Sequence, residues 1–421
     1  MKKLLMLTTI LCLLMGVCPV NTAQAASHFH ALCTIDGCEH FEHDHSDYYF
    51  VPLRAASDLS AGCYYLTEDT DVGTLTIGNG RELRLCLNGH TLYHNGIILN
   101  ENDDWYNTRL YLCDCKGGGQ IKPRPGSSAG ITVNNSALFL YGGKVTGHTN
   151  TAITLHTSPT EYSAAELYVF GGEISGNSGV NGGGIACIND PSNDTFPYVA
   201  LMGGVIRNNT ATRGGGVYIS RGFLCLEDTS IADNAATEGG GVYMTGNSYY
   251  ELRNGVHIER NRTTGGMGGG LYVSGKIGGE VSGKDLFIYN NTSDGKPCNL
   301  YLARDMHRIV SMGGSSGKIG LYVEDPVTPD EPLRFLDGFD DTSVREEDIA
   351  VFVSDQGYGI RLQDYPYEDV RGTEGVLYVP TTPTPAPVPP ATGDSAPVLL
   401  WAALLLMTAG AAVLLRRRAA R

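Results

Sequence analysis

The sequence predicts an all-β protein whose central part is a parallel β-helix solenoid of about nine turns. Three observations lead to this prediction. The chain contains 55 glycines and 23 tyrosines but only 18% charged residues, a composition that does not fit a helical protein. Short alternating strands recur with a period of about 28 residues. Asparagine and glycine also recur at fixed places within each period.

The N-terminus has the pattern of a secretory signal peptide. Met1–Ala25 begins with Lys2 and Lys3, continues as an apolar run and ends on small residues. We therefore expect the protein to be exported, which excludes a cytosolic enzyme. The formal net charge of −15 becomes more negative once the basic ends are removed, and an acidic surface makes nucleic acid an unsuitable partner.

Residues 26–50 form a leader that is rich in cysteine and histidine. Thiolate and imidazole are ligands that zinc prefers, so this leader could bind a zinc ion as a cofactor. Alternatively, the two cysteines form a disulfide outside the cell and the histidines are solvated. The spacing does not select a ligand set. The candidate metal ligands are His28, His30, Cys33, Cys38, His40, His43 and His45.

Residues 51–325 carry the repeats that predict the β-helix. Each period contains three short strands separated by polar or glycine turns, as in the units that begin at Leu138, Leu167 and Leu224. Helical repeats would need apolar residues three and four apart, and propeller blades would need four antiparallel strands and a longer period. A three-strand coil with glycine corners is typical of a parallel β-helix.

An Ile-x-x-Asn unit follows the first strand of several periods. Asparagine tolerates a left-handed corner conformation, and its amide can bond the equivalent residue one coil away. We therefore expect a structural asparagine ladder whose backbone forms the corner. Its members are Asn177, Asn209, Asn234, Asn261 and Asn291.

One tyrosine per period follows the apolar residue that opens the third strand. If Val217 and Ile219 point inward, Tyr218 points outward and its counterparts stack above it. Such a row could bind sugar rings, or the stacked rings could only stabilise the coil. The row contains Tyr218, Tyr243, Tyr272, Tyr301 and Tyr322.

Three further cysteines, Cys86, Cys113 and Cys115, lie at closely corresponding positions in adjacent coils. They could form a disulfide between coils, act as a reactive thiol, or pack as a buried stack of small apolar side chains, which we favour. No catalytic residue is assigned. The acidic pairs Asp103–Asp104 and Asp340–Asp341 lie outside the regular repeats, although a β-helix can still assemble a site from distant turns.

The repeat units Gly-Gly-x-Ile-x-x-Asn and Gly-Gly-Gly-Val-Tyr resemble those of right-handed parallel β-helix surface proteins, the pectate-lyase-like superfamily. The stretches at Tyr64–Thr67, Leu85–His90, Leu112–Cys115 and Phe352–Tyr358 are similar to segments of surface proteins from Gram-positive gut bacteria. The resemblance covers residues 50–379. It implies a right-handed coil and a surface role but no particular activity.

The C-terminal part resembles a cell-wall sorting signal. Pro390, Thr392 and Gly393 stand in the motif Pro-Ala-Thr-Gly, which precedes an apolar span at Pro397–Leu415 and three arginines. The resemblance implies that a sortase joins Thr392 to peptidoglycan. The usual motif begins with leucine, whereas Pro389 stands there, so a plain membrane anchor is the alternative. The expected segments are 1–25, signal peptide; 26–50, leader; 51–325, β-helix; 326–379, C-terminal β cap; 380–393, Pro-rich stalk and sorting motif; and 394–421, transmembrane helix and basic tail.

The sequence therefore predicts an adhesin or glycan-binding protein on the cell wall, or on the outer face of the plasma membrane, of a Gram-positive bacterium. The expected partners are sortase and peptidoglycan, with glycans or a host surface as binding targets. The membrane is contacted only through the C-terminal helix before processing. The alternative is an extracellular polysaccharide lyase or glycoside hydrolase.

Overall fold

The computed structural model describes most of the chain between residues 28 and 380. The described ranges are 28–32, 44–100, 108–158, 164–189, 195–275, 277–304, 309–338, 343–365 and 372–380. The predicted signal peptide, sorting motif and membrane helix lie outside these ranges, as do residues 33–43 of the leader. The described residues as far as Val379 belong to one compact unit.

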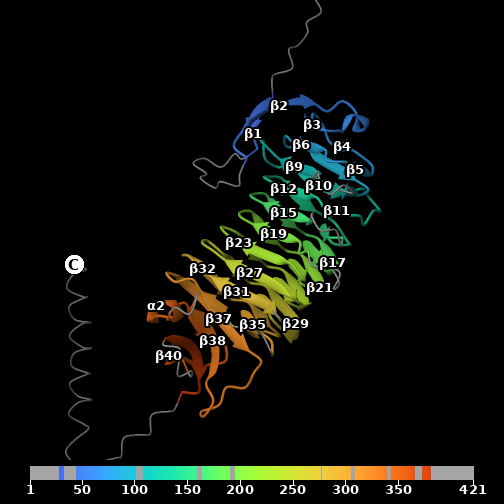
Figure 1. Cartoon of the computed structure of the whole chain (residues 1–421). Coiled ribbons are helices and arrows are strands. Elements are labelled where there is room, and N and C mark those ends of the chain that lie inside the picture. The colour runs from blue at the N-terminus through green and yellow to red at the C-terminus, as the bar shows by residue number, and fades with distance from the viewer. Residues whose placement is uncertain are drawn as a thin grey trace, which may run out of the picture. The chain divides into compact units, whose positions relative to one another are not determined.

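These residues form a parallel β-helix of about eight turns, close to the nine that the repeats predict. Figure 1 shows successive coils following one another from the blue to the orange end of the colour scale. The described residues contain one short 3-10 turn, η1 (Ala56–Asp58), and one short helix, α2 (Glu346–Ile349). All their other regular elements are strands, which belong to three sheets.

Sheet I receives one strand from each coil. Its strands in spatial order are β1 (His28–Ala31), β2 (Asp47–Pro52), β3 (Gly62–Tyr65), β6 (Glu82–Cys86), β9 (Arg109–Cys113), β12 (Ala137–Leu140), β15 (Glu166–Val169), β19 (Tyr198–Leu201), β23 (Phe223–Leu226), β27 (Ser248–Leu252), β31 (Ile277–Val281), β36 (Ile309–Ser311), β38 (Leu333–Gly338), β41 (Thr373–Tyr378) and β40 (Gly359–Asp364). From β2 to β38 the neighbouring strands are parallel, as a solenoid requires.

Sheet II receives two strands from a typical coil. Its strands in chain order are β4 (Thr70–Asp71), β5 (Leu75–Gly78), β7 (Thr91–His94), β8 (Ile97–Asn100), β10 (Gln120–Pro123), β11 (Ile131–Asn134), β13 (Lys144–Thr146), β14 (Ile153–His156), β16 (Glu173–Ser175), β18 (Ile185–Ile188), β20 (Val205–Arg207), β22 (Val217–Ser220), β24 (Ser230–Ala232), β26 (Val242–Thr245), β28 (His257–Glu259), β30 (Leu271–Val273), β32 (Leu286–Tyr289), β35 (Leu300–Leu302), β37 (Gly317–Val323) and β39 (Phe352–Ser354).

Sheet III is an addition that the sequence did not predict. Its strands are β17 (Ser178–Asn181), β21 (Thr210–Arg213), β25 (Ala235–Glu238), β29 (Arg262–Met267), β33 (Thr292–Ser293) and β34 (Lys296–Pro297). In the middle coils the chain stays extended after the ladder asparagine and pairs with the same segment one coil away. These coils therefore have four strands instead of three.

The glycine runs after sheet III bring adjacent coils into direct backbone contact. A Cβ atom on Gly183 would lie 2.5 Å from the carbonyl oxygen of Gly215, and one on Gly240 would lie 2.5 Å from that of Gly269. Real Cβ atoms do not approach a backbone oxygen so closely, so only glycine allows the coils to stack at this corner.

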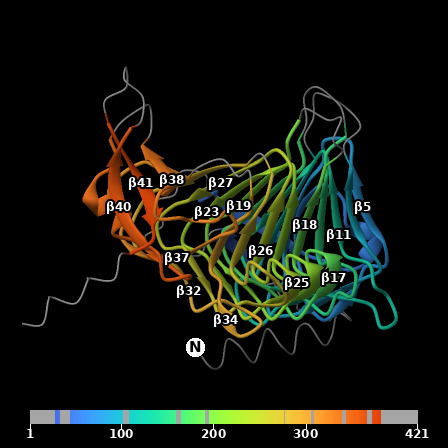
Figure 2. The same cartoon turned by 90° about the horizontal axis from the view of Figure 1, so that it is seen from below.

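Apolar side chains fill the space between the sheets. Leu110, Leu138 and Leu167 stand in register on neighbouring strands of sheet I, and all three are fully buried. Because side chains alternate along a strand, their neighbours on either side point outward. At the C-terminal end, β41 is antiparallel to both β38 and β40, which closes sheet I with a hairpin in place of another coil. Figure 2 shows these strands at the end opposite to β5.

A ladder of asparagine amides runs inside the stack. Asn234 shows the pattern: its Oδ1 accepts the backbone N–H and the side-chain amide of Asn209, at 3.0 and 3.1 Å. Its Nδ2 donates to the carbonyl oxygen of Ile206 at 3.0 Å and to Oδ1 of Asn261 at 2.9 Å. Every polar atom of this buried side chain is therefore satisfied. The same bonds link Asn177 to Asn209 and Asn261 to Asn291.

The ladder extends beyond the asparagines that the sequence suggested. Asn291 donates to Oδ1 of Asn299 through both its backbone N–H and its amide. Asn299 donates in the same way to the two carboxylate oxygens of Asp355, at 2.7 and 2.8 Å. At the other end, the backbone N–H and Nδ1 of His148 lie 3.1 Å from Oδ1 of Asn177.

The corner conformation lies one residue earlier than we expected. Positive φ angles occur at Asn208, Asp233, Arg260 and Asn290, each directly before a ladder asparagine, whereas the ladder asparagines themselves have no positive φ. Left-handed backbone at the preceding residue turns the chain so that the asparagine side chain points into the interior. The expectation that the ladder backbone itself forms the corner is therefore wrong.

Two buried histidines start the ladder, and their protonation is fixed by their partners. The N–H of Gly96 donates to Nδ1 of His94, so the proton of this neutral ring is on Nε2, which lies 3.1 Å from Nε2 of His148. His148 must accept there and carries its proton on Nδ1, from which it donates to Asn177. Burial lowers the pKa of His94 to about 3 and the pKa of His148 to about 4.

We expect Asn234→Val to destabilise the coils around residues 209–261. The substitution removes four hydrogen bonds and leaves buried partners unsatisfied, each at a cost of about 1–3 kcal/mol. Because the stability of a solenoid is approximately local, hydrogen exchange should accelerate in these coils more than near residue 75. Asn247→Val, at an exposed turn of the neighbouring strand, is the matched control. Unchanged protection in the Asn234 variant would contradict a structural ladder.

Acid should destabilise the fold through His94 and His148. The unfolded chain binds protons near pH 6.5, whereas the lowered pKa values keep both rings neutral in the folded state. The free energy of unfolding should therefore fall as the pH falls from about 6.5 towards 4, by about 1.4 kcal/mol per pH unit for each ring. Urea unfolding at several pH values measures this slope. The slope should be smaller in the double variant His94→Gln/His148→Asn and unchanged in the control variant His90→Gln. An equal slope in the unchanged protein and in both variants would refute the assignment.

Candidate functional sites

The tyrosine row lies on the outward column of sheet II, where strands β22, β26, β30, β35 and β37 carry one tyrosine each. Successive ring centroids lie 5.5, 4.7, 5.2 and 5.0 Å apart, and the ring planes differ by 10 to 25°. Each ring therefore covers the face of its neighbour. Tyr218, Tyr272 and Tyr301 are buried, so the row presents edges instead of open faces to a ligand.

A second aromatic row on the outer face of sheet I was missed. Its ring centroids follow one another at 4.6 to 5.7 Å, and most of its members are half-buried. The signal was present in the sequence, because an aromatic residue follows the first leucine in three successive periods. The row contains Tyr111, Phe139, Tyr168, Tyr198, Phe223 and Tyr249.

A groove of about 430 Å³ opens on sheet II at earlier coils than the tyrosine row. Ile98, Thr132 and Thr154 stand side by side on β8, β11 and β14, in the column that continues through Ala186 to Tyr218. These side chains are smaller than tyrosine, so the surface is hollow at these coils. In the coils from Tyr218 onward, tyrosine rings fill the same column. We call this hollow the neutral groove. It is lined by Asn95, Gly96, Ile98, Ala129, Gly130, Thr132, Asn150, Thr151, Thr154, His156, Val180, Asn181 and Ile188.

Among the residues that the structure describes, the neutral groove contains hydrogen-bonding groups and apolar surface but no carboxylate, lysine or arginine. The one titratable side chain among these described lining residues is His156, whose pKa is lowered by burial, so the ring is neutral near pH 7. Val180 is 66% exposed and Ile188 is 39% exposed, which is unusual for large aliphatic residues. The groove therefore suits an uncharged ligand with both hydroxyl groups and an apolar face.

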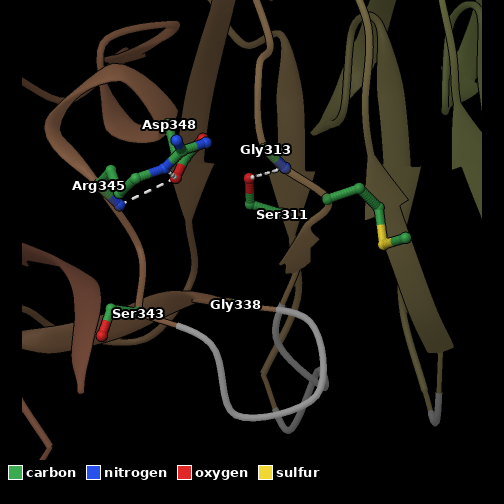
Figure 3. A pocket seen from close by; sticks show the side chains of 7 residues that line it. Ser311, Gly313, Gly338, Ser343, Arg345 and Asp348 are labelled. Atoms are coloured by element: carbon green, nitrogen blue, oxygen red, sulfur yellow. Dashed lines mark hydrogen bonds and ion pairs between the residues drawn. The ribbon is translucent and has the colours of Figure 1, made fainter.

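A second hollow of about 380 Å³ lies near the C-terminal end and is shown in Figure 3. Asp348 accepts the backbone N–H of Arg345 at 2.9 Å, and the Arg345 side chain lies 3.5 Å from the same oxygen. On the opposite wall, Ser311 Oγ accepts the N–H of Gly313 at 3.1 Å. Asp348 is the only carboxylate among the lining residues that the structure describes; Asp340 and Asp341, in the segment between Gly338 and Ser343, lie outside the described residues.

A cluster of two histidines and two cysteines lies where the N-terminal hairpin meets sheet I. His28 and His30 are two residues apart on β1, so their side chains lie on the same face of this strand. β1 pairs with β2, and both imidazole rings face the β-helix. Cys86 ends β6, and Cys115 lies in the turn after β9. One ligand atom from each residue lies within 4.8 Å of all the others. We call these four residues the Cys/His cluster.

The contacts in the Cys/His cluster are short. Nε2 of His28 lies 3.0 Å from Nε2 of His30, 3.4 Å from Sγ of Cys86 and 3.3 Å from Sγ of Cys115. The two sulfur atoms are 3.4 Å apart and are not joined by a disulfide. Hydrogen bonding from Cys113, with smaller contributions from His30 and His28, lowers the pKa of Cys86 to about 3. Burial raises the pKa of Cys115 to about 12.

The structure therefore combines parts of two groups that the sequence analysis treated separately. Of the leader residues proposed as metal ligands, His28 and His30 belong to the Cys/His cluster and His45, which is exposed, does not. Cys33, Cys38, His40 and His43 lie outside the described residues. Cys113 is buried beside Cys86 in an apolar contact group with Leu32, Phe50 and Tyr111, which agrees with the packing role that we favoured for it.

Comparisons with protein families, curated proteins and solved structures find no match to this chain. Among the residues that the structure describes, no helix is long and apolar enough to cross a membrane. The span predicted at Pro397–Leu415 lies outside them. The function must therefore be argued from the surface of this chain itself.

Proposed function

We propose that this chain is a glycan-binding surface protein and that the neutral groove is its binding site. The observation that carries the proposal is the combination of neutral polar side chains with exposed aliphatic ones in a single hollow. A volume of about 430 Å³ lies within the range of small-ligand sites. One or two sugar units of a longer glycan would occupy it.

Amides and hydroxyls suit the hydroxyl groups of a neutral sugar. Asn95 and Asn150 each offer a donor and an acceptor, and Thr132 and Thr154 offer hydroxyls from adjacent strands. The neutral ring of His156 donates its one proton to the backbone of Ile188, so its other nitrogen can accept a hydrogen bond from a sugar hydroxyl. This set can bond several hydroxyls at once without burying a charge.

The aliphatic residues account for the other half of sugar recognition. Ile98, Val180 and Ile188 line the groove, and a ligand that covers their aliphatic surface gains free energy by removing it from water. The C–H face of a sugar ring is such a ligand. The proposed glycan site is therefore the neutral groove and not the tyrosine row that the sequence suggested. The tyrosine ring faces cover one another, whereas the groove is the open part of the same column.

The competing proposal, a polysaccharide lyase or glycoside hydrolase, has less support. Cleavage by paired carboxylates needs two acids on either side of the bond, and the described part of the neutral groove's lining has none. The described lining residues also include no lysine or arginine, the side chains that would hold a uronic-acid polymer. Binding without turnover is therefore favoured.

The proposed location is the wall of a Gram-positive bacterium, with the β-helix displayed outside. The support comes from the chain ends: the signal-peptide pattern at Met1–Ala25 and the motif at Pro390–Gly393 before an apolar span and arginines. The prolines between 380 and 390 would form an extended stalk. Sortase and peptidoglycan are the proposed partners for attachment. The finer description of the coil as right-handed also belongs to this proposal.

A glycan array followed by calorimetry on residues 26–393 tests the binding proposal. We expect neutral glycans to bind in preference to uronic-acid glycans. Thr154→Trp, which fills the groove, should weaken binding at least about tenfold, a loss of about 1.4 kcal/mol. Thr212→Trp, at an exposed position of β21, is the control and should bind normally. Binding that Thr154→Trp leaves unchanged would refute the groove, and release of reducing ends or unsaturated products would favour the enzyme.

Wall attachment can be tested on whole cells. Muramidase digestion should release the protein with wall fragments attached, because the bond formed at Thr392 is covalent. Thr392→Ala should abolish this release, since sortase would no longer act. Recovery of the unchanged protein only from detergent extracts of the membrane would favour the plain anchor.

A further inference from the structure

We propose that the Cys/His cluster is a four-coordinate zinc site that fastens the N-terminal hairpin to the β-helix. Its ligands would be His28 and His30 from β1, Cys86 from β6, and Cys115 from the turn after β9. The proposal is independent of the glycan-binding function. It differs from the expectation drawn from the sequence, because half of the ligands come from the coil and not from the leader.

The spacing of the four atoms fits a tetrahedral site. Zinc binds imidazole nitrogen at about 2.0–2.1 Å and thiolate sulfur at about 2.3 Å, so neighbouring ligand atoms of a tetrahedron lie about 3.3–3.8 Å apart. The contacts among His28, His30, Cys86 and Cys115 are 3.0 to 3.4 Å, and no pair exceeds 4.8 Å. Small side-chain movements that bring the distances between the four ligand atoms to these values would let one zinc ion bind at their centre.

Hydrogen bonding accounts poorly for these close contacts, because a thiol is only a weak donor. Nε2 of His28 is within reach of three lone-pair atoms, on His30, Cys86 and Cys115, but one ring nitrogen has at most one proton to give. A cation that accepts electron pairs from all four atoms can satisfy them together. Two imidazoles and two thiolates form a donor set typical of structural zinc.

The surroundings hold the ligands in place. Nδ1 of His30 lies 2.7 Å from the carbonyl oxygen of Ala31, so its proton is used there and Nε2 is left free for a metal. The ring of His28 stacks on Tyr65 at 4.3 Å, and the ring of His30 stacks on Phe50 at 4.5 Å. Both imidazoles are thereby oriented before an ion binds.

The site would also have a mechanical role. The β1–β2 hairpin joins the body through β2 and β3, which share a short parallel register at Val51–Pro52. Apolar contacts of Leu32 and Phe50 with sheet I add to this attachment. Coordination by Cys86 and Cys115 would join β1 itself to two coils. Occupied by zinc with four protein ligands, the site would be closed and structural.

The test uses the full exported chain without an affinity tag, purified under reducing conditions. We expect one zinc per chain, and cobalt added to the metal-free protein should show the absorption bands of tetrahedral, thiolate-bound Co²⁺. Cys115→Ser and His30→Gln should each lose these bands and the bound metal. Cys63→Ser, a half-buried cysteine on β3, is the matched control and should retain both. His30 belongs to the N-terminal hairpin, so His30→Gln removes a ligand without altering the β-helix.

Hydrogen exchange provides the second measurement. Removing zinc with a chelator should accelerate exchange in residues 28–32 and 44–52 and leave the coils near Asn234 protected. Three results would overturn the proposal: no metal retained by the reduced protein, metal retained by Cys86→Ser/Cys115→Ser, or a Cys86–Cys115 disulfide in the protein isolated from culture medium. The second result would place the metal on other leader residues, and the third would make the link covalent.

Discussion

The buried amide ladder is the interaction on which the rest of the structure depends. An interior asparagine such as Asn234 joins its own coil to both neighbours and satisfies their backbone groups as well as its own side chain. Moving one coil by a residue would leave these polar atoms unpaired in an apolar interior, which is expensive. The ladder therefore fixes the register of the coils. That register determines which outward side chains align in columns and hence where the surface is hollow or filled.

Both candidate sites are consequences of this alignment. On sheet II, one column of outward side chains contains small residues at Thr132 and Thr154 and tyrosines from Tyr218 onward. The same strand geometry therefore forms the neutral groove in the earlier coils and the stacked tyrosine row in the later ones. On sheet I, Cys86 ends its strand where the hairpin crosses. Neither site needs a specialised loop among the described residues. The coil places the side chains, and their sizes and chemistry decide what each surface can bind.

Much of the fold could be predicted from the sequence, because a period of about 28 residues with alternating strands has few other solutions. The asparagines were found for the same reason. The corner was misplaced by one residue, since a propensity for left-handed backbone belongs equally to Asn208 and Asn209 and only the structure separates them. Sheet III was missed because its strands are short and polar. The Cys/His cluster could not be predicted, since His28 and Cys115 are far apart in the sequence and meet only when the hairpin folds onto the coil.

The direction of the ladder has a consequence for how such a chain can change in length. Every interior asparagine receives two bonds from the ladder residue on one side and gives two to the ladder residue on the other, so any coil that carries it is interchangeable with its neighbours. The ends are different: a histidine pair supplies protons at the start, and Asp355, which only accepts, stops the series. Duplication or deletion of one whole period between them would preserve every bond. A lineage of such proteins could thus lengthen or shorten its β-helix in steps of one coil, while the two terminal units stay as they are.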